Sequence, residues 1–103
     1  MIVLTKENFE NEISNYKGSA VIDLYADWCA PCKMLAPIIE ELEGELTDVK
    51  FCKINVDNER ELAAMFKVSS IPMVAVVTNN TLVDFQVGYV TKDALRDFIT
   101  QNL

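Results

Sequence analysis

The sequence predicts an α/β protein with a central mixed β-sheet of about five strands, flanked by about four helices. Short apolar runs alternate with segments of helical periodicity along the chain, as in sheets built from crossover connections. The 103 residues are 50% hydrophobic, which is enough to bury one compact core but not two. No repeat, low-complexity tract or linker divides the chain. We therefore expect a single domain over residues 1–103.

The N-terminal segment predicts a short strand followed by a first helix. Residues 2–4, "IVL", are typical of a strand. Thr5 can then cap a helix, because its side-chain oxygen can accept an N–H group that the first turn leaves unpaired. Phe9, Ile13 and Tyr16 follow at helical spacing and would form the buried face of this helix.

Two central strands flank a long helix. Residues 20–26, "AVIDLYA", form a nearly continuous apolar run, as expected for a strand buried on both faces. A helix should begin at Ala30, since apolar residues then recur at helical spacing. They are Leu35, Ile38, Ile39, Leu42 and Leu46. Residues 49–56, "VKFCKINV", predict the second central strand.

Another helix should follow the second central strand. Asn58, with Glu61 three residues later, resembles a capping box, in which each side chain accepts a backbone N–H of the first turn. Leu62, Met65 and Phe66 would then form the apolar face.

The C-terminal third predicts a β-hairpin and a last helix. Residues 73–77, "MVAVV", and the alternating residues 82–87, "LVDFQV", flank Asn79-Asn80, and asparagine tolerates the positive φ of a tight turn. Thr91 would cap a helix that buries Leu95, Phe98 and Ile99. The order of elements places a parallel portion beside an antiparallel hairpin at one edge of the sheet.

Charge and composition argue against several functional classes. The 9 Lys and Arg against 16 Asp and Glu give a formal net charge of −7 with no basic cluster, so we expect no nucleic-acid partner and no anionic membrane surface. No apolar run approaches the length that spans a membrane, and the N-terminus lacks the pattern of a secretory signal. We therefore expect a cytoplasmic protein, and nothing in the sequence requires more than a monomer.

The segment "YADWCAPCKM", residues 25–34, is the candidate for chemistry. Its cysteines, Cys29 and Cys32, follow a predicted strand and open a predicted helix, whose N-terminal N–H groups and dipole stabilise a thiolate. Pro31 fits there because the first turn needs no N–H partner. The redox interpretation makes Cys29, at the mouth, the attacking thiolate and Cys32 the resolving thiol.

Two other interpretations of the cysteine pair remain open. A zinc site needs four ligands, and this chain has no histidine and only one further cysteine, Cys52, so carboxylates would have to complete the site. The pair could also be inert. We expect Cys52 itself to be a small core residue of its strand.

Downstream segments extend the motif into a family resemblance. "WCAPCK" is preceded by "VIDLYAD" and followed by "MLAPIIEEL", and then "KINVD", "IPM" and "VGY" occur in this order. The sequence resembles the thioredoxin family over essentially the whole chain. The resemblance implies a thioredoxin fold and a protein-disulfide reductase, a thiol-disulfide oxidoreductase whose redox group is the Cys29–Cys32 disulfide, with no bound cofactor. It implies disulfide-containing protein substrates and a thioredoxin reductase, which uses NADPH, as partners.

The resemblance also implies roles for three residues outside the motif. Asp23 could lie at an exposed bend, but the family places a buried carboxylate here as general base for Cys32. Lys53 could simply point to water, whereas the family places it near Asp23, where it reduces the cost of that charge. Pro72 cannot lie inside a central ladder, and the resemblance implies a cis peptide bond against the disulfide.

The remaining candidates would form a small apolar docking surface around Cys29. By the same resemblance it would comprise Trp28, Ala30, Pro31, Ile71, Pro72 and Gly88, extended by Tyr89. Ile71 would offer backbone hydrogen bonds to a substrate, and Gly88 would let the substrate backbone approach.

Ala30 and Met73 depart from the family, which more often has glycine and threonine there. The alternatives to a reductase are an oxidase or isomerase of the same fold and a binding module that does not depend on redox chemistry.

Overall fold

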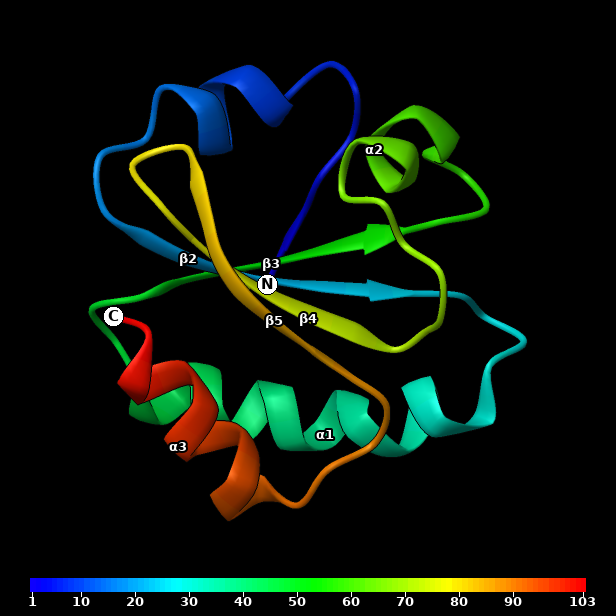
Figure 1. Cartoon of the computed structure of the whole chain (residues 1–103), viewed down its shortest axis with the longest axis vertical. Coiled ribbons are helices and arrows are strands. Elements are labelled where there is room, and N and C mark those ends of the chain that lie inside the picture. The colour runs from blue at the N-terminus through cyan, green and yellow to red at the C-terminus, as the bar shows by residue number, and fades with distance from the viewer.

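The computed structural model describes all 103 residues and contains one five-stranded sheet with helical segments on both faces (Figure 1). The elements are β1 (Ile2–Val3), the π-helix η1 (Glu10–Ser14), β2 (Ser19–Tyr25), α1 (Ala30–Glu45), β3 (Lys50–Asn55), α2 (Arg60–Met65), β4 (Met73–Thr78), β5 (Thr81–Val87) and α3 (Lys92–Gln101). The predicted α/β class and the predicted order of strands and helices are confirmed.

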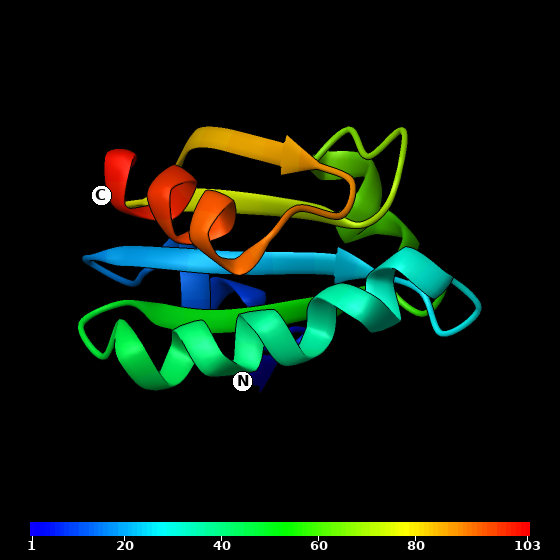
Figure 2. The ribbon, with the colours of Figure 1, turned by 90° about the horizontal axis from the view of Figure 1, so that it is seen from below.

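The sheet has the strand order β1-β3-β2-β4-β5. β3 runs parallel to both β1 and β2, whereas β4 runs antiparallel to both β2 and β5, so the sheet is mixed as predicted. Figure 2 shows the β4–β5 hairpin at one edge. Because β4 is antiparallel to β2, with Leu24 opposite Met73, the residues that follow β2 lie beside those that precede β4.

The sheet divides the core of the protein into two hydrophobic layers, one on each face, because successive side chains of a strand point to opposite faces. One layer lies under η1 and α2, and the other lies under α1 and α3 (Figure 1). We call these sides the η1/α2 face and the α1/α3 face. The first layer includes Ile13, Ile22, Cys52, Ile54, Leu62 and Phe66, and the second includes Val21, Leu35, Ile39, Phe51, Leu95 and Ile99.

The first helical segment is shorter and wider than the sequence predicts. Thr5 is not the N-cap of this segment, which is Phe9 with no side-chain capping bond. Thr5 holds the turn before it, because its Oγ1 accepts the N–H of Asn8 at 3.3 Å and its own N–H donates to Oδ1 of Asn8 at 2.7 Å. The chain then widens into the π-helix η1, in which the N–H of Asn15 donates to the carbonyl of Glu10 at 2.8 Å, five residues back. Ile13 is buried as predicted.

The capping box predicted at Asn58 and Glu61 is wrong. Glu59 is the N-cap of α2 and makes no side-chain capping bond. The buried side chain of Asn55 accepts the N–H groups of Asp57 at 3.0 Å and Asn58 at 3.4 Å instead. The turn before α2 is therefore held from the end of β3.

The predicted hairpin turn and last cap are confirmed. Asn79 and Asn80 have φ values of 49° and 63°, in the left-handed region that a two-residue hairpin turn requires. Thr91 caps α3, with its Oγ1 accepting the N–H of Ala94 at 3.3 Å.

No helix has both the length and the apolar character needed to cross a membrane.

Candidate active site

Cys29 and Cys32 lie at the start of α1, shortly after the end of β2. Cys29 is the N-cap of α1, and its Sγ accepts the N–H of Cys32 at 3.2 Å. The two sulfur atoms form a disulfide, with the Cα atoms 5.2 Å apart, and both residues are buried. Because the positive end of the helix dipole and a backbone N–H face the sulfur of Cys29, a thiolate is stabilised there.

The loop before β4 approaches this sulfur. The Ile71–Pro72 peptide bond is cis, as expected. The carbonyl oxygen of Ile71 lies 3.9 Å from Sγ of Cys29. The antiparallel pairing of β2 and β4 explains this contact, because it brings the start of β4 to the end of β2 where the cysteine pair begins.

Asp23 is a buried carboxyl on β2, as predicted. It is 4% exposed, and its Oδ1 has no hydrogen-bond partner in the protein. Burial raises the pKa of Asp23 to about 7, because a carboxylate is poorly solvated there, and the charge of Lys53 partly opposes this rise. Lys53 is the register partner of Asp23 on β3. The sequence thus correctly predicted that the two residues are neighbours.

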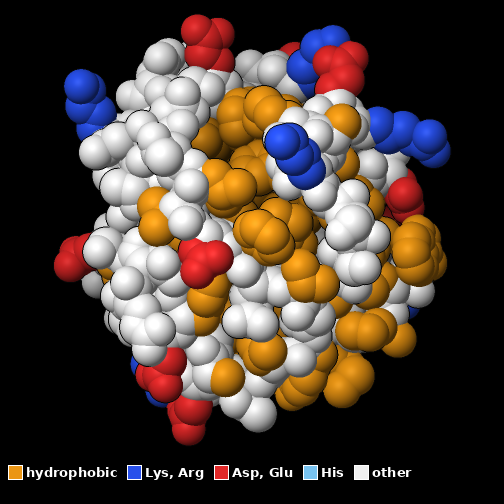
Figure 3. Space-filling model, in the orientation of Figure 1, with side chains coloured by type: hydrophobic (Ala, Val, Ile, Leu, Met, Phe, Trp, Pro, Cys, Tyr) orange, Lys and Arg blue, Asp and Glu red, His pale blue; other side chains and the backbone are white.

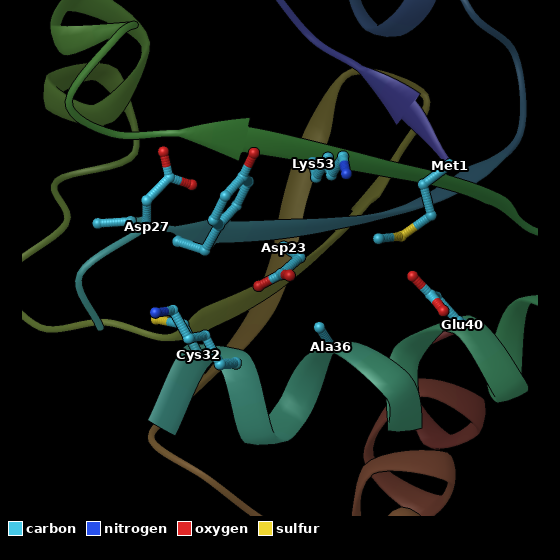
Figure 4. Close-up of a pocket in the computed structure, with 10 residues that line it drawn as sticks. Met1, Asp23, Asp27, Cys32, Ala36, Glu40 and Lys53 are labelled. Atoms are coloured by element: carbon cyan, nitrogen blue, oxygen red, sulfur yellow. The ribbon is translucent and has the colours of Figure 1, made fainter. Parts of the chain in front are cut away.

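A cavity of about 150 Å³ connects Asp23 with Cys32. Figure 4 shows the carboxyl of Asp23 pointing towards α1, with Cys32 at the start of that helix and Lys53 on β3. The cavity is large enough to hold water, which can carry protons between buried groups. It is lined by Met1, Asp23, Tyr25, Ala26, Asp27, Cys32, Lys33, Ala36, Glu40 and Lys53.

Asp57 is a site residue that the sequence analysis missed. Trp28 is 71% exposed, and its Nε1 donates a hydrogen bond to Oδ2 of Asp57 at 2.8 Å. The backbone of Asp57 is fixed in turn by Asn55. A signal was available, since Asp57 follows β3, and the carboxyl ends of the parallel strands β2 and β3 lie at the same edge of the sheet.

The predicted docking residues come from three backbone segments. Ala30 and Pro31 are exposed at the start of α1, Ile71 is half-buried against the cluster that contains Cys29, and Pro72 is buried. Tyr89 is exposed just after β5. The N–H of Gly88 donates to the carbonyl of Pro72 at 2.8 Å.

Two details of this surface are set by the backbone and the core. Gly88 has a φ of 93°, which disfavours any residue with a side chain, and a Cβ there would meet open space. The departure at Met73 lies beneath the surface, because this side chain is buried in the core of the η1/α2 face.

Cys52 is a core residue of its strand, as predicted. It is a free thiol with no exposed surface, packed in the core of the η1/α2 face. Burial, the largest effect, raises its pKa to about 11. No group of three or more potential metal ligands occurs in the structure.

Comparison with known proteins agrees with this geometry. The family model described as Thioredoxin matches residues 1–101. The chain is 38% identical to a thioredoxin of Bacillus subtilis (strain 168) over 104 residues, which cover 100% of this chain and 98% of that protein. It is 40% identical to a thioredoxin of Chlamydia caviae over 97% of this chain and 96% of the relative. A thioredoxin of Haemophilus influenzae is 39% identical over 93% of this chain and 91% of its own length.

Proposed function

This chain belongs to the thioredoxin family and carries out dithiol/disulfide exchange at Cys29–Cys32, and we propose which step of that reaction each residue around the pair performs. The observation that carries the proposal is the asymmetry of the two cysteines. Cys29 caps α1 beside the carbonyl of Ile71, while Cys32 lines the cavity that contains Asp23.

In the first step the Cys29 thiolate attacks one sulfur of a substrate disulfide. An intermolecular disulfide forms, and the other substrate sulfur leaves as a thiolate that takes a proton from solvent. The contacts of Cys29 support this role, because the helix terminus stabilises its thiolate. The carbonyl of Ile71, 3.9 Å from Sγ, is available to accept an N–H of the incoming chain.

In the second step Cys32 resolves the mixed disulfide. Its thiol passes a proton to the carboxylate of Asp23, and the resulting thiolate attacks Sγ of Cys29. The Cys29–Cys32 disulfide forms, and the second substrate sulfur leaves as a thiolate that takes a proton from solvent. A pKa of about 7 leaves about half of Asp23 ready to accept a proton at neutral pH, as suits a general base. Lys53 favours the carboxylate form.

The finer partner and location assignments complete the proposal. The oxidised pair needs two electrons for the next turnover, and we assign their delivery to a thioredoxin reductase that uses NADPH, on the basis of family membership. We propose a cytoplasmic setting, because a free buried thiol beside one exchangeable pair suits a reducing compartment. We also propose that the monomer is active, since both steps use residues of one chain.

Trapping experiments test the two cysteine roles. The probe is a peptide with one intramolecular disulfide, mixed with each reduced variant and followed by intact mass. We expect Cys32→Ser to accumulate a protein–peptide adduct that dithiothreitol releases, and Cys29→Ser to form none. Trapping by Cys29→Ser alone would reverse the roles. Absence of an adduct from both single variants would contradict the redox function and favour a binding module.

A further inference from the structure

β5 is an edge strand that exposes apolar side chains. Leu82, Phe85 and Val87 are 42%, 50% and 41% exposed. They pair with Val77, Ala75 and Met73, which all belong to the core of the η1/α2 face. Because paired residues of antiparallel strands share a face, the three β5 side chains lie on the η1/α2 side, where no helix covers them. We call these three residues the β5 stripe.

A groove continues the stripe at the far end of β5. It has a volume of about 270 Å³ and lies between η1, α2 and the hairpin. In Figure 3, which has β5 nearest to the viewer, hydrophobic side chains line this hollow and continue over β5. The lining contains no charged residue, although the chain carries a net charge of −7. It comprises Phe9, Ile13, Ser14, Met65, Phe66, Val77, Asn80 and Leu82.

The other end of the stripe meets the disulfide-exchange site. Val87 pairs with Met73, and the next residue, Gly88, donates its N–H to Pro72 at 2.8 Å. The loop before Pro72 is the one that approaches Cys29. A substrate attached to Cys29 therefore has the stripe beside it, and the seven residues of β5 extend about 20 Å away from the attachment point.

The backbone edge of β5 is less available than its side-chain face. Gly88 and Pro72 form a hydrogen-bonded pair, so the alternation of antiparallel pairs directs the N–H of Phe85 towards the open edge. Oδ1 of Asp84 already accepts this N–H at 2.8 Å. The β4–β5 register also shifts between Val76 and Val77. A carboxylate and a bulge are features that oppose pairing with another strand.

We propose that the β5 stripe and its groove bind an uncharged apolar segment of a disulfide-bearing protein substrate while the substrate is joined to Cys29. The inference rests on the proposed function and deepens it by naming a substrate class. Continuity with the exchange site identifies the occupant as the substrate, and the uncharged lining identifies its chemistry. Such a surface selects substrates by apolar burial and not by charge.

Activated peptides test this proposal in the Cys32→Ser background. Each peptide carries one cysteine as a mixed disulfide with thionitrobenzoate. Attack by the Cys29 thiolate forms the protein–peptide disulfide and releases thionitrobenzoate, whose absorbance gives the rate. The set comprises a tripeptide and two series with seven further residues, apolar in one and glutamine-rich in the other, extended in either chain direction. We expect the apolar series to react about tenfold faster than the glutamine-rich series.

The variant Leu82→Gln, Phe85→Gln should remove this advantage and leave the tripeptide rate unchanged. Val3→Gln is the matched control, because Val3 is 51% exposed on the opposite edge of the sheet, and it should preserve the advantage. Equal rates for the two series, or an advantage that survives in the double variant, would overturn the inference. A dimer in sedimentation that the double variant abolishes would also overturn it, since the face would then be a self-interface. Failure of the tripeptide to react would count against the proposed function itself.

Discussion

Asp23 and Cys52 are both buried on neighbouring central strands, yet burial has opposite consequences for their reactivity. They are one position apart in the register, because Ile22 lies opposite Cys52 and Asp23 lies opposite Lys53. Asp23 faces α1 and the cavity that reaches Cys32, whereas Cys52 faces the closed core of the η1/α2 side. The same physical effect, loss of solvation, raises both pKa values.

The two groups differ in how the raised pKa compares with neutral pH. The pKa of an ordinary carboxyl group is well below 7, so burial raises the pKa of Asp23 to about 7, and Asp23 can exchange protons under physiological conditions. The pKa of an ordinary thiol is already above 7, so burial raises the pKa of Cys52 to about 11, and the nucleophilic thiolate is nearly absent at neutral pH. Burial therefore makes Asp23 able to exchange protons at neutral pH and keeps the Cys52 thiol unreactive.

The largest expected effect is the loss of the proton acceptor. Asp23→Asn should slow the resolving step about 100-fold at pH 7, because Cys32 loses its general base. Rapid mixing of the reduced variant with a disulfide peptide, followed by acid quenching, measures the decay of the mixed disulfide.

The control for this variant is Asp27→Asn, which makes the same substitution at another carboxyl group in the lining of the same cavity. It should resolve the mixed disulfide at nearly the parent rate. Equal slowing by the two variants would mean that net charge, and not proton transfer at Asp23, governs the step.

Asp23→Asn should also stabilise the fold by about 4 kcal/mol at pH 7. The folded state holds the proton of Asp23 more tightly than the unfolded chain does, so the parent loses stability as the pH rises from about 4 to about 7. The variant lacks this loss, and the difference should vanish below about pH 4. Urea unfolding at several pH values measures it; a constant difference across the range would contradict the buried-carboxyl assignment.

A smaller effect is expected from Lys53→Met. The lysine charge lowers the pKa of Asp23, so its removal should raise that pKa further and slow resolution at pH 7 by about threefold. The pH at which resolution reaches half its maximal rate should move upwards. Lys50→Met is a useful comparison, because this lysine is on the same strand but contacts Glu12 and Tyr16, and it should leave the midpoint unchanged. A downward shift in Lys53→Met would refute the assignment.

The smallest effect is expected at Cys52. Cys52→Val should change the free energy of unfolding by less than about 1 kcal/mol and leave exchange unaffected, because the substitution is apolar and close in volume. In the reduced parent an alkylating reagent should leave Cys52 unlabelled in the folded state and label it in urea. Rapid native labelling of Cys52 would show that its core is not closed.

The sequence predicts the main architecture because long apolar periodicities and turn residues are local signals. The strand at β2, the helix after Cys29 and the turn at Asn79-Asn80 all follow from such signals. The start of α2 does not, because the turn before it is held by Asn55 at the end of a strand and not by the local cap expected at Asn58. The widening of η1 also depends on packing that no local pattern specifies.

The sequence also predicts only part of the candidate site. The cysteine pair and Asp23 stand out because their chemistry is unusual for their positions, a close pair at a helix start and a charge inside an apolar strand. Asp57 has neither feature, and only the adjacency of β2 and β3 places it beneath Trp28. The cavity that joins Asp23 to Cys32 depends on the spacing between the sheet and α1, which is a tertiary property.

The sealed position of Cys52 has a consequence for oxidative refolding. Three cysteines can pair in three ways, and unfolding exposes the Cys52 thiol, which can then attack the Cys29–Cys32 disulfide and release one of its sulfurs as a thiol. A scrambled chain that links Cys52 to either active-site cysteine would have to connect the closed core of one sheet face to a helix terminus at the sheet's end, so it could not regain this fold. Denatured oxidised protein should therefore partition between refolding and a misbridged trap, and Cys52→Val should close the route to that trap.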